Sequence, residues 1–322
     1  MKEKILILGV SSFAGFSFYN YLKNKNYKLY GTFNKNLNIG KLNYDKIVLK
    51  RINFENNQKK FLNWIKILKP NYIIDFASIC MVNESWKYSK KYFAINFYSK
   101  IKILNYIAKK KFLKKFIYIS TPEVFGNTTK ILNENLCNFK PSTPYALSKL
   151  ALEKYLLSLN CGKKFIITRF SNFYGPYQPN YRLIPKVILT ILNKKKITID
   201  GDGLSKRNYI YADDFCSGIF KIIKSKSNKN IYHFSGDDFY SVNQIIKKIC
   251  DIMNINFDHF IRFSKERKGK DKIYKLNSIK TRRNLSWKTK FDLDSGIKNT
   301  INFIEKNKKL INKRPYKFNI NN

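Results

Sequence analysis

Short apolar runs alternate along the chain with longer segments in which apolar residues recur every three or four positions. The first pattern is typical of buried strands and the second of amphipathic helices. Strand-like runs appear at Ile5–Leu8, Tyr27–Phe33, Lys46–Leu49, Tyr72–Phe76, Phe116–Ser120, Phe165–Arg169 and Ile231–Phe234. Helical patterns lie between them, at about Phe13–Lys23, Lys59–Leu68, Tyr88–Lys110, Thr143–Leu159 and Tyr211–Ile223. This alternation predicts an α/β fold in which helices cover both faces of a parallel sheet.

The alternation stops after Arg169. Asn172–Gln178 is rich in turn residues, a helix follows near Ile184–Leu192, and the rest of the chain predicts mixed short elements. We interpret this part as a smaller, interleaved C-terminal lobe that binds substrate. The predicted division assigns 1–170, with a contribution from 207–240, to the sheet domain, and 171–206 with 241–322 to the smaller lobe.

A glycine-containing turn follows the first apolar run. Gly9 ends that run, and Gly15 lies at the expected start of the first helix. A strand, a tight turn and a helix start in this order direct backbone amides at a pyrophosphate. Ser12 occupies the position where the usual pattern has a middle glycine, and its hydroxyl is small enough to face a phosphate. With the strand–helix alternation, this turn predicts a Rossmann-like doubly wound sheet that binds a dinucleotide.

The end of the second predicted strand bears on the choice of dinucleotide. NAD enzymes of this fold usually carry an acidic residue there, which accepts from the ribose 2′-hydroxyl. This strand ends in Phe33, Asn34 and Lys35, without an acid. Lys35 would instead suit a 2′-phosphate, and Asn53 after the third strand does not decide the matter. NAD and NADP are therefore both compatible with the sequence.

The charge of the chain is strongly positive. It has 63 Lys and Arg against 21 Asp and Glu, for a formal net charge of +42. The excess is mostly Lys and is spread along the whole chain, without a zinc-finger or RNA-recognition signature, so we expect no dedicated nucleic-acid function. The five cysteines are scattered and only two histidines occur, which predicts no metal site and a cytoplasmic location. No apolar run reaches the ~18 residues of a membrane helix.

Tyr145 and Lys149 form the most informative pair of residues. Side chains four positions apart share one helix face. A phenol titrates near pH ~10, and a neighbouring ammonium stabilises its phenolate. A hydroxyl from Thr121 would hold the substrate oxygen whose proton Tyr145 takes. The set is suited to removing a proton from a sugar or alcohol hydroxyl while hydride leaves the same carbon.

Six motifs in order give the chain a family resemblance over nearly its whole length. They are GVSSFAG at 9–15, STPEVFG at 120–126, PSTPYALSK at 141–149, RFSNFYGPYQ at 169–178, GDG at 201–203 with Arg207, and RKGKD at 267–271. The chain resembles the extended short-chain dehydrogenase/reductase (NAD-dependent epimerase/dehydratase) family. Within that family it is most similar to the dTDP-glucose 4,6-dehydratases and related nucleotide-sugar 4,6-dehydratases.

This resemblance implies a reaction and a set of site residues. Tyr145, Lys149 and Thr121 would oxidise C4 of a nucleotide-diphosphate sugar, and Glu123 would take the proton from C5 before water leaves C6. The implied NAD(P) contacts are Gly9, Ser12, Phe13, Ala14, Gly15, Asn34, Lys35, Asn53, Ala77, Asn96, Tyr145 and Lys149. The implied substrate contacts are Val82, Thr121, Asn172, Arg182, Arg207 and Arg267. The resemblance also implies a homodimer, joined through a four-helix interface of Tyr88–Lys110 and Thr143–Leu159.

One departure from the family pattern keeps alternatives open. The dTDP-glucose dehydratases carry an Asp that protonates the leaving hydroxyl, and this chain has Pro122 there. A 4-epimerase and a UDP-glucuronate decarboxylase use the same Thr/Tyr/Lys set. Glu123 favours a dehydratase or a decarboxylase over an epimerase. A non-catalytic protein that binds coenzyme or polyanions on the same fold is disfavoured by the intact set.

Overall fold

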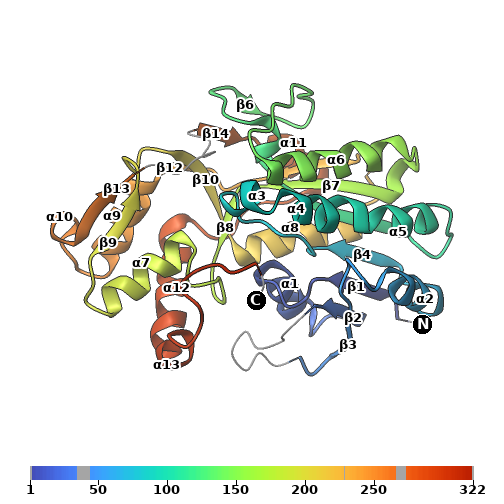
Figure 1. The fold of residues 1–322 in the computed structure, drawn as a ribbon, viewed down its shortest axis with the longest axis horizontal. Helices are drawn as coiled ribbons and strands as arrows, with labels where there is room; N and C mark the ends of the chain where they lie inside the picture. The colour runs from blue at the N-terminus through green and yellow to red at the C-terminus, as the bar shows by residue number, and fades with distance from the viewer. Residues whose placement is uncertain (1, 35–43, 228, 266–272, 321–322) are drawn as a thin grey trace.

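The computed structural model describes residues 2–34, 44–227, 229–265 and 273–320 (Figure 1). Its largest element is a parallel sheet of seven strands in the order β11-β7-β5-β4-β1-β2-β3. The strands are β1 (Lys4–Leu8), β2 (Lys28–Phe33), β3 (Ile47–Arg51), β4 (Tyr72–Asp75), β5 (Lys115–Ser120), β7 (Phe165–Phe170) and β11 (Ile231–Phe234). This order places later strands on both sides of β1, and it confirms the predicted doubly wound Rossmann-like sheet.

Helices bury both faces of this sheet. Ile5 and Ile7 of β1 pack in one core with α1 (Phe13–Leu22) and α8 (Ala212–Lys224). Leu6 and Leu8 point into the other core, with α2 (Gln58–Leu68), α5 (Ser99–Ala108) and α6 (Pro144–Ser158). Neighbouring residues of a strand face opposite sides of a sheet, so a strand buried on both sides is continuously apolar.

The segment expected as one helix over Tyr88–Lys110 is interrupted. Helix α3 (Glu84–Lys87) and helix α4 (Ser89–Phe93) lead into a π-helical turn, η1 (Ala94–Tyr98), before α5 begins at Ser99. A π turn adds a residue to the helical repeat and is frequent at functional sites. Periodicity alone does not reveal this turn because the apolar spacing continues on either side.

A second, mixed sheet lies on the other side of the molecule. Its central strand β10 (Lys206–Tyr211) runs parallel to β8 (Asn172–Tyr174) and β14 (Ile273–Leu276) and antiparallel to β12 (Phe239–Ser241). Strand β6 (Ile131–Leu132) completes it beyond β14, and β9 (Ile197–Asp200) pairs with β13 (Ile261–Ser264). Helices α7 (Leu183–Leu192), α9 (Val242–Ile252) and α12 (Leu293–Lys306) form a separate core with this lobe, at the left of Figure 1.

The remaining elements are short. They are η2 (Pro122–Phe125), η3 (Gly162–Lys164), α10 (Phe257–Phe260), α11 (Ile279–Leu285) and α13 (Lys308–Ile311). Among the described helices, none has the length and apolar character needed to cross a membrane. The residue boundaries predicted for the two lobes stay a prediction: α8 and β11 lie with the large sheet, whereas β10 lies in the second one.

Two contacts fix helix α6 and the second lobe relative to the large sheet. Arg169 at the end of β7 is almost fully buried, and it pairs with Glu153 of α6 and bonds His233 of β11 at 3.0 Å. Phe13 of α1 stacks on Phe173 of β8 with ring centroids 4.4 Å apart. Breaking a buried, paired charge costs several kcal/mol, so the position of α6 is firmly set.

Candidate active site

The strand order of the large sheet changes direction between β1 and β4, which is where an open α/β sheet forms its crevice. Gly9 at the end of β1 has φ +72, and an added Cβ would lie 2.9 Å from the Cα of Ala77, just after β4. Such a φ and such a close approach favour glycine. In open α/β sheets this switch point, outside the carboxyl ends of the strands, is where ligands bind.

The turn between β1 and α1 is closed by its own side chain. The Ser12 hydroxyl donates to the Gly9 carbonyl at 2.8 Å and accepts from the Gly15 amide at 3.0 Å. It therefore caps α1 instead of pointing outwards as a phosphate ligand. A Cβ at Gly15 would lie 2.3 Å from the Gly9 carbonyl oxygen, which keeps the turn tight. Ala14 lies in the first turn of α1, and the half-buried Phe13 beside it packs against the second lobe.

The ribose end of the crevice contains a cation that the sequence analysis missed. Arg51 at the end of β3 donates from Nε to the Asn34 carbonyl at 3.0 Å, and both residues are exposed. Asn53 accepts from the Glu55 amide at 2.9 Å and so closes a local turn. Lys35 lies outside the described residues. Strand pairing of β2 with β3 carries Arg51 to this position, although it is distant from Asn34 in sequence.

Tyr145 and Lys149 lie in the first half of α6. Thr143 caps this helix by accepting from the Ala146 amide at 3.1 Å, and Pro144 occupies its first turn. A Thr cap followed by proline fixes the helix start, and the four-residue spacing then puts both side chains on one face. Lys149 Nζ donates to Ser78 Oγ at 2.9 Å and to the Ile119 carbonyl at 2.7 Å. An ammonium has three donors, so one N–H remains for a bound ligand.

Burial shifts the pKa of both side chains. It raises the pKa of Tyr145 well above its usual value, and the Glu123 carboxylate acts in the same direction, whereas a hydrogen bond with Thr121 lowers it. The pKa of Lys149 is lowered to about 7, mainly by burial and next by the charge of Lys100. Desolvation disfavours the charged form of each group. The net shift of Tyr145 is therefore opposite to the lowering expected from a neighbouring ammonium, because burial outweighs it in the protein without ligands. Perturbed pKa values of this kind in a crevice are typical of functional sites.

Thr121 and Glu123 follow β5 directly. Thr121 is buried and caps the short helix η2 by accepting from the Glu123 amide at 3.3 Å. The half-buried Glu123 is the only acidic residue in that first turn. Its charge raises the pKa of Tyr145 and of Tyr274. The short helix η2 that carries it packs through Val124 and Phe125 against Tyr274 of β14. Pro122 is buried beside Glu123 and has no proton to give.

The loop after β4 is braced by the π turn. Asn96 is fully buried; its Oδ1 accepts from the Ile79 amide at 2.9 Å and its Nδ2 donates to the Ile79 carbonyl at 3.0 Å. Nδ2 also lies 3.0 Å from Ser148 Oγ of α6. Asn96 thus holds the loop through its side chain. Further along, the Val82 carbonyl accepts from the Ser85 hydroxyl at 2.6 Å.

The second lobe brings two of the predicted substrate residues together. The Tyr274 hydroxyl donates to Asn172 Oδ1 at 2.9 Å, and the Arg207 guanidinium lies 5.0 Å from the Tyr274 ring centroid. Arg182, at the start of α7, lies elsewhere: its Nη2 donates to the Cys80 Sγ at 3.0 Å. The charge of Arg182 lowers the pKa of Tyr145, and its contact with Cys80 joins it to the loop after β4. Arg267 lies outside the described residues.

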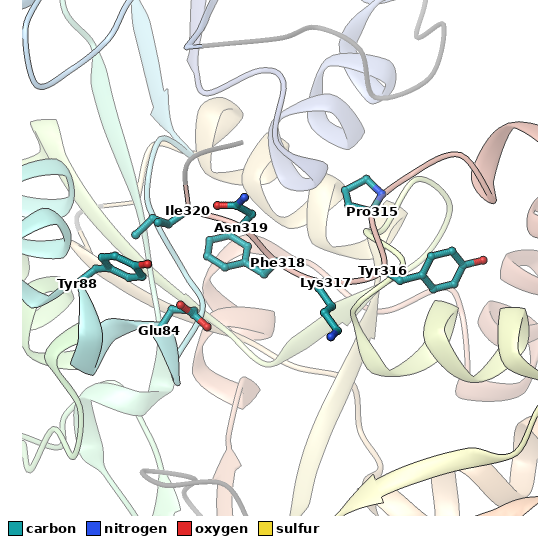
Figure 2. Close-up of a pocket in the computed structure, with 8 residues that line it drawn as sticks. All are labelled: Glu84, Tyr88, Pro315, Tyr316, Lys317, Phe318, Asn319 and Ile320. Atoms are coloured by element: carbon teal, nitrogen blue, oxygen red, sulfur yellow. The ribbon is translucent and has the colours of Figure 1, made fainter.

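A cavity of about 600 Å³ lies near the C-terminus, between Glu84, Tyr88 and residues 315–320 (Figure 2). None of the predicted site residues lines it. Phe318 in this segment packs edge-on against Tyr181, the residue before Arg182. The C-terminal segment therefore lies close to the start of α7.

Several residues near the crevice were not singled out from the sequence. Ser78 and Cys80 contact Lys149 and Arg182, and Asp75 pairs with Lys100 directly behind this loop. The sequence did offer a signal for Asp75 and Lys100, because an acid inside an apolar strand and a lysine on the buried face of a helix are unusual. Ser78 and Cys80 carry no such signal because small residues are common in loops.

Comparisons with known proteins agree with this geometry. The NAD dependent epimerase/dehydratase family matches residues 5–234. The chain is 30% identical to dTDP-D-glucose 4,6-dehydratase of Dictyostelium discoideum, with 95% of this chain and 82% of that protein covered. It is 29% identical to the human dTDP-D-glucose 4,6-dehydratase, with 84% and 82% covered.

Solved structures share the fold. A Bacillus anthracis dTDP-glucose 4,6-dehydratase in complex with NAD superposes with a TM-score of 0.85 at 24% identity and covers 96% of this chain and 98% of its own. A Bacillus cereus UDP-glucuronic acid 4-epimerase in complex with UDP-glucuronic acid and NAD superposes with a TM-score of 0.83 at 25% identity. The superposition covers 94% of this chain and 99% of the epimerase chain. From the family match and the Gly9, Tyr145 and Lys149 geometry, we conclude that the chain belongs to the NAD-dependent epimerase/dehydratase family of enzymes.

Proposed function

We propose that this enzyme is a nucleotide-sugar 4,6-dehydratase similar to the dTDP-glucose 4,6-dehydratases. The observation that carries the proposal is the position of Glu123, whose charge raises the pKa of the Tyr145 phenol across the crevice. Oxidation at a sugar carbon needs only the Thr/Tyr/Lys set. A carboxylate beside it supplies the base that a following elimination requires.

NAD is the coenzyme of the family, and we propose that it binds at the carboxyl ends of β1 and β4. The end of β2, which lacks an acid, also suits NADP. The turn from Gly9 to Gly15 would lie against its pyrophosphate, because the N-terminus of α1 presents amides there. Lys149 would donate its third N–H to the nicotinamide ribose of the coenzyme. When bound, the coenzyme supplies the acceptor for the C4 hydride and returns the same hydride at C6.

The residues of the chain then divide the proton transfers. Tyr145 accepts the proton of the sugar O4 as C4 is oxidised, while Lys149 stabilises the phenolate and Thr121 holds the oxygen. The C4 ketone acidifies the C5 proton, which Glu123 takes, and the electron pair expels the C6 hydroxyl. That hydroxyl leaves as water after gaining a proton, from Glu123 or from a water molecule, since Pro122 has none. The two protons taken by Tyr145 and Glu123 would then be returned, one to the leaving hydroxyl and one to C5, so the net change is the loss of one water.

Substrate binding is expected to involve both lobes. Asn172 and Arg207 lie together through Tyr274, where a nucleotide diphosphate would find a guanidinium and amide donors. Val82 belongs to the loop that faces the sugar. The residues of 171–206 and 241–322 would supply this binding lobe, and 1–170 with 207–240 would hold the coenzyme.

A second candidate is a decarboxylase acting on a nucleotide uronic acid. Arg182 supports it, because its guanidinium lies near enough to Tyr145 and Cys80 to face a sugar carboxylate. Such an enzyme uses the same C4 oxidation, but carbon dioxide leaves from C5 instead of water from C6.

The Glu123→Gln variant tests the proposal. The amide keeps the shape of the side chain but is a poor base. Mixed with nucleotide-sugars, the variant should oxidise C4 and accumulate reduced coenzyme, seen by its near-ultraviolet absorbance, with little 4-keto-6-deoxy product and no solvent deuterium at C5. A 4-epimerase never breaks the C5 bond to hydrogen and would turn over normally. Carbon dioxide release from a uronic acid would identify the decarboxylase. Normal dehydration by the variant would remove Glu123 from the mechanism.

We also propose a homodimer formed by α4, α5 and α6 of each subunit. Tyr98 of η1, between α4 and α5, and Leu147 and Leu157 of α6 are exposed, with 68%, 46% and 42% of their surface accessible. Apolar side chains exposed at this level suit a contact with a second copy. Sedimentation measures the oligomeric state of the wild type, expected to be a dimer, and of a Leu147→Asp/Leu157→Asp variant, expected to be a monomer. A monomeric wild type would exclude the proposed dimer.

A further inference from the structure

A buried ion pair lies directly behind the catalytic lysine. Asp75 at the end of β4 and Lys100 in α5 are 1% and 3% exposed, and Lys100 Nζ donates to Asp75 Oδ2. Removing two charges from water is costly, and apolar residues of similar volume often give equal or greater stability. Stability alone therefore does not account for this pair.

The pair holds the backbone that carries Ser78. Lys100 Nζ also donates to the Ala77 carbonyl at 2.6 Å, and Asp75 Oδ1 accepts from the Ala77 amide at 3.0 Å. Ala77 is thus held at both its backbone groups. The next residue, Ser78, accepts from Lys149 Nζ at 2.9 Å. Asp75 and Lys100 therefore influence the position of Lys149 through Ala77 and Ser78 of the same loop.

The pair also acts on Lys149 through charge. Both ammonium groups lie over the same aromatic ring, with Lys149 Nζ 4.8 Å and Lys100 Nζ 6.0 Å from the Tyr118 centroid. Burial is the main reason that the pKa of Lys149 is low, the Lys100 charge comes next, and Asp75 opposes it. The titratable groups that face Lys149 come from five segments: Asp75 on β4, Cys80 in the following loop, Lys100 on α5, Tyr118 on β5, and Glu153 on α6.

We propose that Asp75 and Lys100 are positioning residues that hold Ser78 against Lys149 and set the pH at which Lys149 loses its charge. The consequence for catalysis rests on the proposed function, because Lys149 must be charged to stabilise the Tyr145 phenolate. The effect on Lys149 itself does not depend on which reaction the enzyme performs.

Carbon-13 spectroscopy of the lysine Cε atoms measures this effect in the protein without substrate. In the wild type one lysine signal should titrate near neutral pH, and its absence from Lys149→Met identifies it. Lys100→Met removes the like charge and leaves the Asp75 carboxylate, so the Lys149 midpoint should rise by roughly one pH unit or more. Asp75→Asn should lower it.

The double variant Asp75→Asn/Lys100→Met buries no unpaired charge. It replaces the single variants in the titration if these do not fold. Lys100 acts more strongly than Asp75, so the double variant should titrate above the wild type but below Lys100→Met. Lys100→Arg keeps the charge and is the matched control, with a midpoint near that of the wild type.

Activity gives a second measurement once a substrate is known. The alkaline limb of the kcat profile, where Lys149 loses its proton, should move in the same order as the midpoints. General damage to the fold would lower kcat in every variant without ordering the midpoints by charge. Equal Lys149 midpoints in the wild type and in the variants that fold would overturn the proposal, even if the enzyme is a dehydratase. Ordered midpoints in a protein without dehydratase activity would support it while refuting the proposed function.

Discussion

Arg182 Nη2 donates a hydrogen bond to the Cys80 Sγ at 3.0 Å, which joins the start of α7 to the loop after β4. The two residues come from different lobes, and both affect the pKa of Tyr145. The contact therefore closes the catalytic side of the crevice between the lobes. Cys80 is nonetheless exposed, so its thiol is within reach of reagents.

Alkylation of Cys80 should inactivate the enzyme. A carbamidomethyl group would occupy the space beside Tyr145 and displace Arg182. We expect iodoacetamide to lower kcat/KM at least about tenfold, equivalent to about 1.4 kcal/mol in the barrier. Cys80→Ser keeps an acceptor for Arg182, so it should remain active and resist the reagent, although Cys137 is also exposed. Equal inactivation of Cys80→Ser would assign the effect to another cysteine.

Tyr145→Phe should abolish turnover while leaving the fold and coenzyme binding nearly intact. The ring keeps its packing in α6, and only the hydroxyl that hydrogen-bonds with Thr121 is lost. Loss of a positioned acid–base group usually costs a factor of ~10²–10⁴. Steady-state rates measure the loss of turnover, and coenzyme titrations of the wild type and of Tyr145→Phe show whether binding is kept. More than about a tenth of the wild-type activity would exclude Tyr145 as the base.

Lys149→Met should change stability in a pH-dependent manner. The pKa of Lys149 is about 7 in the folded protein and about 10.4 in an unfolded chain. Between these values the unfolded chain binds the extra proton, so the folded wild type gains stability as pH rises through this window. Below pH 7 the folded wild type carries the full cost of burying the charged Lys149, whereas a methionine at this position has no such cost.

The free energy of unfolding of Lys149→Met relative to the wild type should therefore be highest near pH 6 and decline toward pH 10. The decline should be on the order of a few kcal/mol. The lost hydrogen bonds to Ser78 and Ile119 lower the stability of the variant at every pH and do not change this decline. Urea unfolding of both proteins across this range measures it. A difference that is constant with pH would show that Lys149 titrates normally in the folded protein.

The coenzyme preference should depend on the cations at the ends of β2 and β3. We expect the wild type to bind NADP at least comparably with NAD, because neither Phe33 at the end of β2 nor the following Asn34 is an acid and the exposed Arg51 lies beside Asn34. Lys35→Asp should shift the preference toward NAD, and Arg51→Ala should weaken NADP more than NAD. Fluorescence titrations with both coenzymes decide it. Strong NAD preference in the wild type that neither substitution changes would show that both cations only face solvent.

The sequence by itself determined the features that depend on neighbouring residues. Apolar runs predicted the strands of the large sheet because a strand buried on both sides is apolar throughout. The spacing of Tyr145 and Lys149 placed them on one helix face, and the glycines marked the turn after β1, because helical period and backbone sterics act over a few residues. The interruption of the helix near Asn96 was missed, since one extra residue in a π turn leaves little trace in periodicity.

The tertiary structure decided what depends on contacts distant in the chain. Asn96 braces Ile79, and Arg182 lies against Cys80 while Arg207 lies with Tyr274. The ionisation of Lys149 likewise depends on burial and on Asp75 and Lys100, which strand and helix packing bring behind it. Desolvation and charge act through space, and only the folded chain fixes those distances, so no local pattern carries this information.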